Sequence, residues 1–414
     1  LEQRRQTILA SIEEQGTLTP ELRQAVLEAD TKNRLEDLYL PYKPKRRSKA
    51  LIAREAGLEP LADALLADPS RDPPQLAGDY LNPDAGIGEP AAALDGARQI
   101  LMERFAEDAD LLAALRRFLH ENALLASRVV AGKEAEGAKF RDYFEHTEAL
   151  ARVPSHRALA MFRGRNEGIL NLNLVMHAEE QPADSHPCEA MIAGHWQIED
   201  CDRPADRWLC DTVRWAWRVK LLTHLQTDLL GELRERAEAE AIQVFANNLK
   251  DLLLAAPAGP RVTIGLDPGL RTGGKVAVVD ANGKLLEHGA IFPTPPQNRV
   301  DEAAATLLGM IRRHGASLIA IGNGTAGRET DRFVGELLRA HPELEVCKVM
   351  VNEAGASVYS ASEFAAREFP DLDVTIRGAV SIARRLQDPL AELVKIEPRS
   401  IGVGQYQHDV SQVQ

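Results

Sequence analysis

The chain has 414 residues, of which 44% are hydrophobic and 27% charged, a composition typical of a globular protein with about two to four domains. Its formal net charge of −13 argues against a protein that attracts nucleic acid by overall positive charge, so any phosphate contacts must come from local patches. No apolar stretch approaches the length of a membrane span, and we therefore expect no membrane partner and a cytoplasmic location.

Residues 1–260 are predicted to be mainly helical, and a basic segment interrupts the helices early in the chain. Pro41 and Pro44 exclude a regular helix there. The cations of this segment are Lys43, Lys45, Arg46, Arg47 and Lys49. Two interpretations remain open, a solvated linker and a patch that binds the phosphates of a nucleic acid.

Two features stand out in the later part of the helical region. An Asn-Glu-Gly turn followed by apolar–polar alternation predicts a short β-hairpin near residues 160–176. Three tryptophans lie further on, at 208, 215 and 217, in a stretch with helical spacing. This spacing favours packing in a core over a surface on which bases stack.

A Pro- and Gly-containing linker at residues 255–260 predicts a domain boundary, and residues 261–400 follow with an α/β pattern. We expect strands near residues 262–267, 274–280, 285–292, 317–322 and 346–351, and helices near residues 299–314, 328–340, 355–368 and 378–396. Three consecutive strands, then helices alternating with strands, is the order of a ribonuclease H-like mixed sheet with helices on both faces. The fold class predicted for the chain is therefore an all-α region followed by an α/β domain.

Acidic residues stand where predicted strands stop. Asp267 ends the first strand of the α/β domain, Glu353 follows the last one, and Asp388 lies in the late helix. Packing explains such acids poorly, because a buried strand favours apolar residues. If the three acids converge, they would form a catalytic site that binds Mg²⁺ or Mn²⁺, as in two-metal phosphodiester hydrolysis.

A structural interpretation of the same acids stays open. Arg384 and Arg385 precede Asp388 at helical spacing and would pair with it, which also makes this edge attractive to nucleic-acid phosphates. Glu353 would then cap the helix that follows it.

A glycine-rich loop connects a predicted strand to a helix and contains Asn323, Gly324 and Thr325. Backbone N–H groups at such a place can bind a phosphate, although the loop lacks the Gly-Lys-Ser/Thr ending of a Walker motif. A tight strand-to-helix turn explains it equally well.

These motifs resemble the Tex family of bacterial transcription accessory proteins. The resemblance includes Gly-Leu-Asp-Pro-Gly-Leu-Arg-Thr-Gly at 265–273 and Gly-Asn-Gly-Thr-Ala-Gly-Arg-Glu-Thr at 322–330. Further matching stretches are residues 37–47, 352–363, 377–393 and 401–410. Together they extend over nearly the whole chain.

The resemblance implies a helix-turn-helix-like N-terminal part and a YqgF domain, which is a resolvase-like ribonuclease H fold. It also implies helix-hairpin-helix and S1 RNA-binding domains after residue 414, with residues 401–414 as the start of the connection to them. We therefore expect this sequence to be a piece of a longer protein. In the family, RNA or DNA would be bound mainly by those further domains, and the transcription machinery is a possible partner class.

The function expected from the resemblance is that of a nucleic-acid-binding transcription accessory protein. The YqgF domain would act as a scaffold with a vestigial acidic site, and no cofactor would be required. Two alternatives stay open: a metal-dependent resolvase-like nuclease that uses Asp267, Glu353 and Asp388, and a protein-interaction platform built on the long helices.

Overall fold

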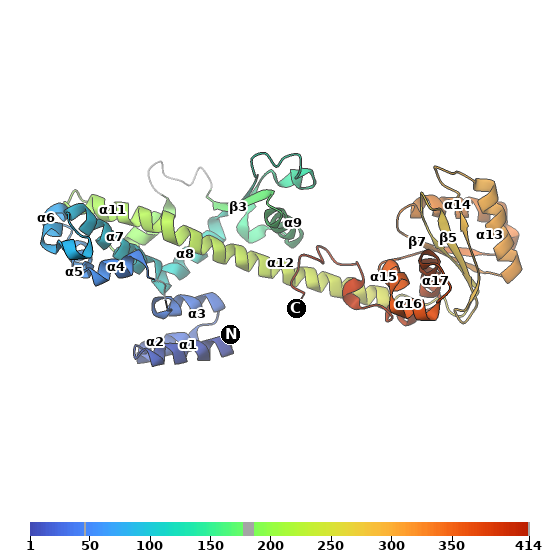
Figure 1. The fold of residues 1–414 in the computed structure, drawn as a ribbon, viewed down its shortest axis with the longest axis horizontal. Coiled ribbons are helices and arrows are strands. Elements are labelled where there is room, and N and C mark those ends of the chain that lie inside the picture. The colour runs from blue at the N-terminus through green and yellow to red at the C-terminus, as the bar shows by residue number, and fades with distance from the viewer. Residues whose placement is uncertain (45–46, 177–185, 413–414) are drawn as a thin grey trace. The chain divides into compact units, whose positions relative to one another are not determined.

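The chain divides into two compact units, Leu1–Glu238 and Ala239–Gln414 (Figure 1). The computed structural model describes residues 1–44, 47–176 and 186–412. The sequence predicted a boundary at residue 260, but the division lies inside helix α12 (Leu222–Leu253). The reason is that side chains at the end of α12, such as Leu249, pack in a hydrophobic cluster of the second unit that includes Ile401.

Three helices begin the first unit: α1 (Glu2–Glu14), α2 (Pro20–Glu28) and α3 (Lys32–Tyr39). Thr19 and Thr31 start the second and third of them, because each threonine hydroxyl accepts a hydrogen bond from a backbone N–H of the first turn. Apolar side chains from all three helices form one small core, which contains Ile8, Ile12, Val26, Leu35 and Tyr39.

A second group of helices follows: α4 (Lys49–Glu55), α5 (Glu59–Ala67), α6 (Pro73–Ala77), α7 (Pro90–Ala106) and α8 (Ala109–Asn122). Helix α7 is central to the group, since α4, α5 and α6 all contact it. Gly96 permits the close packing, because a Cβ atom at this position would lie 2.3 Å from Leu58 Cδ1.

The first unit also contains a small antiparallel sheet in the order β2-β1-β3. Its strands are β1 (Leu124–Val129), β2 (Glu145–Ala149) and β3 (Leu170–Val175). The hairpin predicted near residues 160–176 is wrong, because α9 (Ser155–Asn166) occupies the first part of that range. Strand β3 pairs instead with β1, which is distant in sequence.

The helical region ends with α10 (Pro187–His195), α11 (Asp206–Trp215), a π-helical turn (Ala216–Leu221) and the long helix α12. None of the described helices is long and apolar enough to cross a membrane.

The second unit is built on a five-stranded sheet in the order β6-β5-β4-β7-β8. The strands are β4 (Thr263–Asp267), β5 (Gly274–Val279), β6 (Leu285–Ile291), β7 (Leu318–Gly322) and β8 (Cys347–Val351). The first three pair antiparallel, and β7 and β8 extend the sheet in parallel to β4. The carboxyl ends of β4, β7 and β8 therefore meet at the same edge of the sheet.

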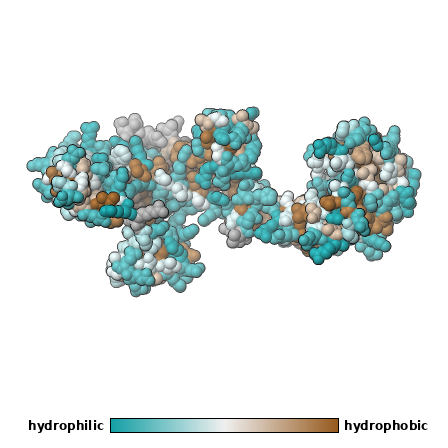
Figure 2. All heavy atoms as spheres, in the orientation of Figure 1, coloured by the Kyte–Doolittle hydropathy of each residue, from teal (hydrophilic) through white to brown (hydrophobic). Residues whose placement is uncertain are grey.

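Helices cover both faces of this sheet. Helices α13 (Val300–His314) and α14 (Gly327–Ala340) pack on one face, and α17 (Val374–Gln387) packs on the other. The short helices α15 (Ala356–Ala361), α16 (Glu363–Glu368) and α18 (Pro389–Leu393) complete the unit. This arrangement confirms the predicted ribonuclease H-like fold. The side chains on the visible surface are mainly hydrophilic (Figure 2).

Candidate functional site

Asp267 ends the central strand β4 at the carboxyl edge of the sheet. Helix α17 crosses this strand at very short range, because glycines are present at both points of contact. A Cβ atom at Gly265 would lie 2.0 Å from the carbonyl oxygen of Ala379, and one at Gly378 would lie 2.6 Å from Oδ2 of Asp267. The carboxylate of Asp267 is therefore partly enclosed by the backbone of α17.

Glu353 follows β8 and brings a second carboxylate to the same edge. This carboxylate lies against two glycines of the loop after β7, since Cβ atoms at Gly322 and Gly324 would stand 2.2 Å from Oε2 and 1.6 Å from Oε1. The backbone N–H of Glu353 donates to Oδ1 of Asn323 at 3.1 Å. The loop predicted to bind phosphate thus makes room for Glu353 and fixes its backbone, and Thr325 is exposed beside it.

The carboxylate of Glu353 acts on Asp267. Burial, the larger cause, and the nearby carboxylate of Glu353 together raise the pKa of Asp267 to about 6, while Lys275 opposes the rise. Oε2 of Glu353 is buried without a hydrogen-bond partner among the described residues. An edge with two close carboxylates and one unsatisfied oxygen attracts a cation.

Asp388 lies at the other end of the sheet, so the predicted convergence of three acids is wrong. The side-chain amide of its neighbour Gln387 donates to the carbonyl oxygens of Arg261 and Asp280, at 2.7 and 2.8 Å, next to the start of β4. Helix α17 runs antiparallel to β4 and carries Asp388 away from Asp267. The exposed Asp388 instead accepts a hydrogen bond from the N–H of Ala391 at 3.0 Å and caps α18.

The predicted pairing of Arg384 and Arg385 with Asp388 is also wrong. Arg384 donates to the carbonyl oxygen of Gly283 at 2.7 Å and forms an ion pair with Glu368 at 2.6 Å. Arg385 has a different role, because it lies buried beneath the loop that carries Glu353.

Arg385 is 3% exposed and donates to the carbonyl oxygens of Asn352 and Ala354, at 2.9 and 2.7 Å. Burial lowers its pKa to about 10, while the carboxylates of Glu392 and Glu353 oppose this change, so the guanidinium stays charged at neutral pH. Arg385 therefore fixes the backbone on both sides of Glu353. A buried arginine cannot at the same time bind nucleic acid at the surface.

A third acid, Asp373, was not predicted from the sequence and lies at the start of α17. It caps this helix by accepting a hydrogen bond from the N–H of Thr375 at 2.8 Å. Hydrogen bonds from Thr375 lower the pKa of Asp373, and Lys275, which also acts on Asp267, contributes at longer range. An aspartate directly before a helix is a sequence signal for a helix cap and could have identified Asp373. The signal was not recognised because the helix was predicted to begin near residue 378, whereas α17 begins at Val374.

The basic segment is only partly described. Lys45 and Arg46 lie outside the described residues. Arg47 forms an ion pair with Glu55 at 2.7 Å, while Lys43 and Lys49 are exposed. Lys43 and Lys49 are therefore the described cations of this segment that remain available to a phosphate.

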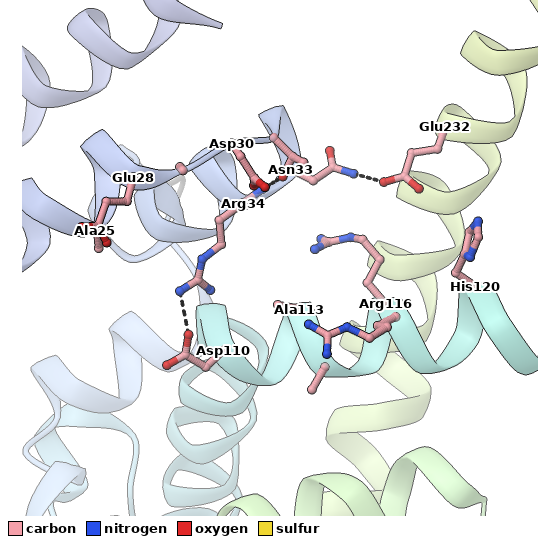
Figure 3. A pocket seen from close by; sticks show the side chains of 14 residues that line it. Ala25, Glu28, Asp30, Asn33, Arg34, Asp110, Ala113, Arg116, His120 and Glu232 are labelled. Atoms are coloured by element: carbon pink, nitrogen blue, oxygen red, sulfur yellow. Dashed lines mark hydrogen bonds and ion pairs between the residues drawn. The ribbon is translucent and has the colours of Figure 1, made fainter.

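The first unit contains a pocket of about 790 Å³ lined by α2, α3, α8 and α12 (Figure 3). Charged side chains of both signs surround it and engage each other. Arg34 forms an ion pair with Asp110 at 2.7 Å, and Asn33 donates to Glu232. The pocket is therefore lined by charges of both signs, with no excess of cations to recognise an anionic ligand.

Next to this pocket, Asp37, His224 and Asp228 have ligand atoms close enough together to hold a metal ion. The guanidinium of Arg116 already occupies the centre of the group, with ion pairs of 2.7 Å to both aspartates. Burial would raise the pKa of Asp37, but His224 and Arg116 lower it below its ordinary value. The donor set is therefore neutralised within the protein, and the group is an ion-pair network that joins three helices.

Two family models match the chain. Residues 68–245 match the model described as Tex central region-like, and residues 261–387 match the Tex protein YqgF-like domain. The first match lies within the helical region and the second covers the sheet together with α13, α14 and α17.

Relatives match over nearly all of the chain. It is 61% identical over 416 residues to Protein YhgF of Escherichia coli and 56% identical over 413 residues to transcriptional accessory protein Tex of Neisseria gonorrhoeae, in each case across 100% of the chain and 53% of the relative. It is 34% identical over 418 residues to S1 RNA-binding domain-containing protein 1 of Homo sapiens, across 98% of the chain and 41% of that protein. The chain spans about half the length of the bacterial relatives. It belongs to the Tex family, whose central region and YqgF-like domain it contains.

Proposed function

We propose that this chain is part of a cytoplasmic transcription accessory protein and that its YqgF-like domain holds nucleic acid as a scaffold without cutting it. Two relatives support the general role by their names, one a transcriptional accessory protein and the other an S1 RNA-binding domain-containing protein. The observation that carries the proposal is the composition of the acidic edge, where Asp267 and Glu353 meet and Asp388 is absent.

Two-metal hydrolysis requires several carboxylates that are free to ligate and correctly spaced around the scissile phosphate. Asp267 and Glu353 supply oxygen ligands suited to one Mg²⁺ or Mn²⁺, and water would provide the remaining ligands. Asp373 is engaged in capping its own helix. A single ion at this edge would neutralise the acid pair and help to hold a phosphate, which favours binding over cleavage.

A metal-dependent nuclease is the second candidate function. The raised pKa of Asp267 beside Glu353 favours it, because perturbed carboxylates concentrate at catalytic sites. The two candidates differ in whether a bound strand is cut when a metal is supplied.

Titration of the 414-residue chain against fluorescently labelled single-stranded RNA tests the binding role, with anisotropy as the readout at two salt concentrations. The net charge of −13 leads us to expect weak, salt-sensitive binding, with a dissociation constant of about 1 µM or more. Absence of binding at low salt would contradict the proposal. Sub-micromolar binding would contradict the expectation that further domains of the family supply most of the affinity.

A further inference from the structure

One tryptophan of the helical region lies on the surface. Trp215, the last residue of α11, is 54% exposed, whereas Trp217 is 2% exposed and its ring centroid lies 4.8 Å from that of His186. The π-helical turn Ala216–Leu221 begins between the two tryptophans. The expectation that these tryptophans pack in a core is therefore wrong for Trp215, and π-helical turns of this kind occur frequently at functional sites.

The exposed surface continues along the helix from Trp215. Val219, four residues later, is 52% exposed, and Arg218 beside it has a side chain that is 67% exposed. In a π-helical turn the residue four positions on still lies on nearly the same side, so Trp215 and Val219 form one exposed apolar stripe, with Arg218 beside Val219. The stripe combines a flat aromatic face, a small apolar contact and a guanidinium.

Positive charge is concentrated on the same segment of a chain whose net charge is −13. Arg214 and Arg218 flank the tryptophan, and Arg207 and Lys220 have no ion-pair partner within the described residues. Arg214 pairs with Asp211 at 3.0 Å, and Arg218 lies 3.5 Å from Glu189. The pair of Arg214 with Asp211 is half-exposed and contributes little free energy, so a phosphate can replace Asp211 as partner. Glu189 is buried, so Arg218 keeps this partner and has further N–H donors, on a side chain that is 67% exposed, for a phosphate.

We propose that Trp215 stacks on a base of single-stranded nucleic acid whose phosphates contact Arg214 and Arg218, an inference that rests on the nucleic-acid-binding role proposed above. Stacking on one exposed ring face is sequence-tolerant, and flanking arginines complement the phosphate backbone. A stable protein partner would require a much larger surface, about 800 Å² on each side, and Trp215 and Val219 provide only a narrow apolar stripe.

The test uses the 414-residue chain, a labelled uridine oligomer of roughly 15 nucleotides and the matching DNA oligomer, at several salt concentrations from about 50 to about 200 mM. Trp215→Ala should weaken binding about tenfold, because one base stack is worth about 1–3 kcal/mol, whereas Trp215→Phe should retain most of the affinity. Arg214→Ala/Arg218→Ala should lower the salt slope by about 1.4, or about 0.7 for each lost phosphate contact.

Phe364→Ala is the matched control, because Phe364 is a 47% exposed aromatic residue of the second unit. It should leave the affinity unchanged. Tryptophan fluorescence gives a second readout. The oligomer should quench the fluorescence of the wild-type protein, and this quenching should largely disappear in Trp215→Phe.

Two failures are distinguishable. Wild type that binds measurably while Trp215→Ala binds equally well would overturn the stacking site and leave the proposed function intact. Wild type that binds neither oligomer at low salt would defeat the proposed function and this inference together.

Discussion

The carboxylate of Glu353 lies directly against the backbone of Gly324, where a Cβ atom would stand 1.6 Å from Oε1. The loop after β7 therefore leaves just enough space for the Glu353 side chain that follows β8. No larger residue fits at Gly324 unless Glu353 moves. Because the obstructing atom is the end of a flexible side chain, displacement of Glu353 costs less than distortion of the sheet.

Gly324→Ala should consequently displace Glu353 without unfolding the domain. The pKa of Asp267 should fall towards its ordinary value, since the nearby Glu353 carboxylate contributes to its rise. Carbon-13 NMR of the carboxyl groups, assigned with Asp267→Asn, measures this change. Gly402→Ala is the control, because a Cβ atom at Gly402 would have no neighbour within 4 Å. An unchanged pKa in Gly324→Ala would show that Glu353 does not act on Asp267 as the structure indicates.

Asp267 should lower the stability of the protein at neutral and higher pH. Its folded-state pKa of about 6 exceeds the ordinary value of 3.8, so between these pH values the folded state binds more protons than the unfolded state. The free energy of unfolding therefore decreases as pH rises through this range and stays lower above it. Asp267→Asn should be more stable than wild type by about 2 kcal/mol at pH near 8 and nearly equal to it below the ordinary carboxyl pKa.

Urea denaturation of both proteins at the two pH values checks this sign. Asp388→Asn is the matched control, because Asp388 is exposed at the opposite end of the sheet and asparagine also caps a helix. A stabilisation by Asp267→Asn that is the same at both pH values would contradict the assignment of the effect to ionisation.

Arg385 should contribute strongly to stability, because it is buried, whereas the nearby Asp388 is exposed. Arg385→Met removes the donors to the carbonyl oxygens of Asn352 and Ala354 and leaves Glu392, which is 2% exposed, without a nearby cation on that side. We expect a loss of about 3 kcal/mol in the free energy of unfolding, as for other broken buried ionic groups. Arg399→Met, at an exposed arginine, should have little effect. Equal denaturation midpoints for the two variants would refute the role of Arg385 as a buried support of the Glu353 loop.

The basic segment gives a prediction about salt dependence. If Lys43 and Lys49 contact phosphates, their joint replacement by Ala should weaken binding of single-stranded RNA without sequence preference and reduce the salt slope by about 1.4. Arg47→Ala should have a smaller effect, because Arg47 is paired with Glu55. A salt slope identical to that of wild type would identify the segment as a linker.

The fold of the second unit was predictable because its signals are local. Each strand is a short apolar run that ends in a turn, and the order of strands and helices fixes the sheet. The meeting of Asp267 and Glu353 also followed from this order, since Asp267 ends β4 and Glu353 follows β8, and both strands run parallel to β7. By contrast, β1 pairs with strands distant in sequence and lies directly after a Leu- and Ala-rich helix, so its pattern gave no separate signal.

The wrong pairing of Asp388 with Arg384 and Arg385 has a physical cause at the end of α17. The sequence predicted a helix that continues to residue 396, and the pairing of Arg384 with Asp388 assumed helical spacing. The helix in fact ends at Gln387, and Asp388 has an extended backbone with φ −149° and ψ 94° that starts α18. The proline at 389 fits this break, since the residue before a proline avoids the helical region.

The last prediction concerns catalysis, which separates the two candidate functions. We expect no efficient cleavage of branched DNA, duplex DNA or RNA in Mg²⁺ or in Mn²⁺. Asp267 and Glu353 provide two carboxylates, and the pKa of Asp267, about 6, leaves only a minor fraction of it protonated at neutral pH. Asp388, which was expected to be the third ligand, caps a helix at the far end of the sheet instead. Two ions that clamp both the attacking and the leaving oxygen need more ligands than this pair supplies.

The incubation should include Asp267→Asn and Glu353→Gln beside wild type, with gel analysis of end-labelled substrates. Metal-dependent cleavage by wild type that disappears in both variants would establish the nuclease and overturn the scaffold proposal. Cleavage that persists in both variants would indicate a contaminating enzyme, because the same two carboxylates would then be irrelevant to the reaction. Mn²⁺ bound by wild type but not by the variants, with every substrate intact, is the result that the acidic edge predicts: a site that holds a cation beside a phosphate and lacks the ligands to cut.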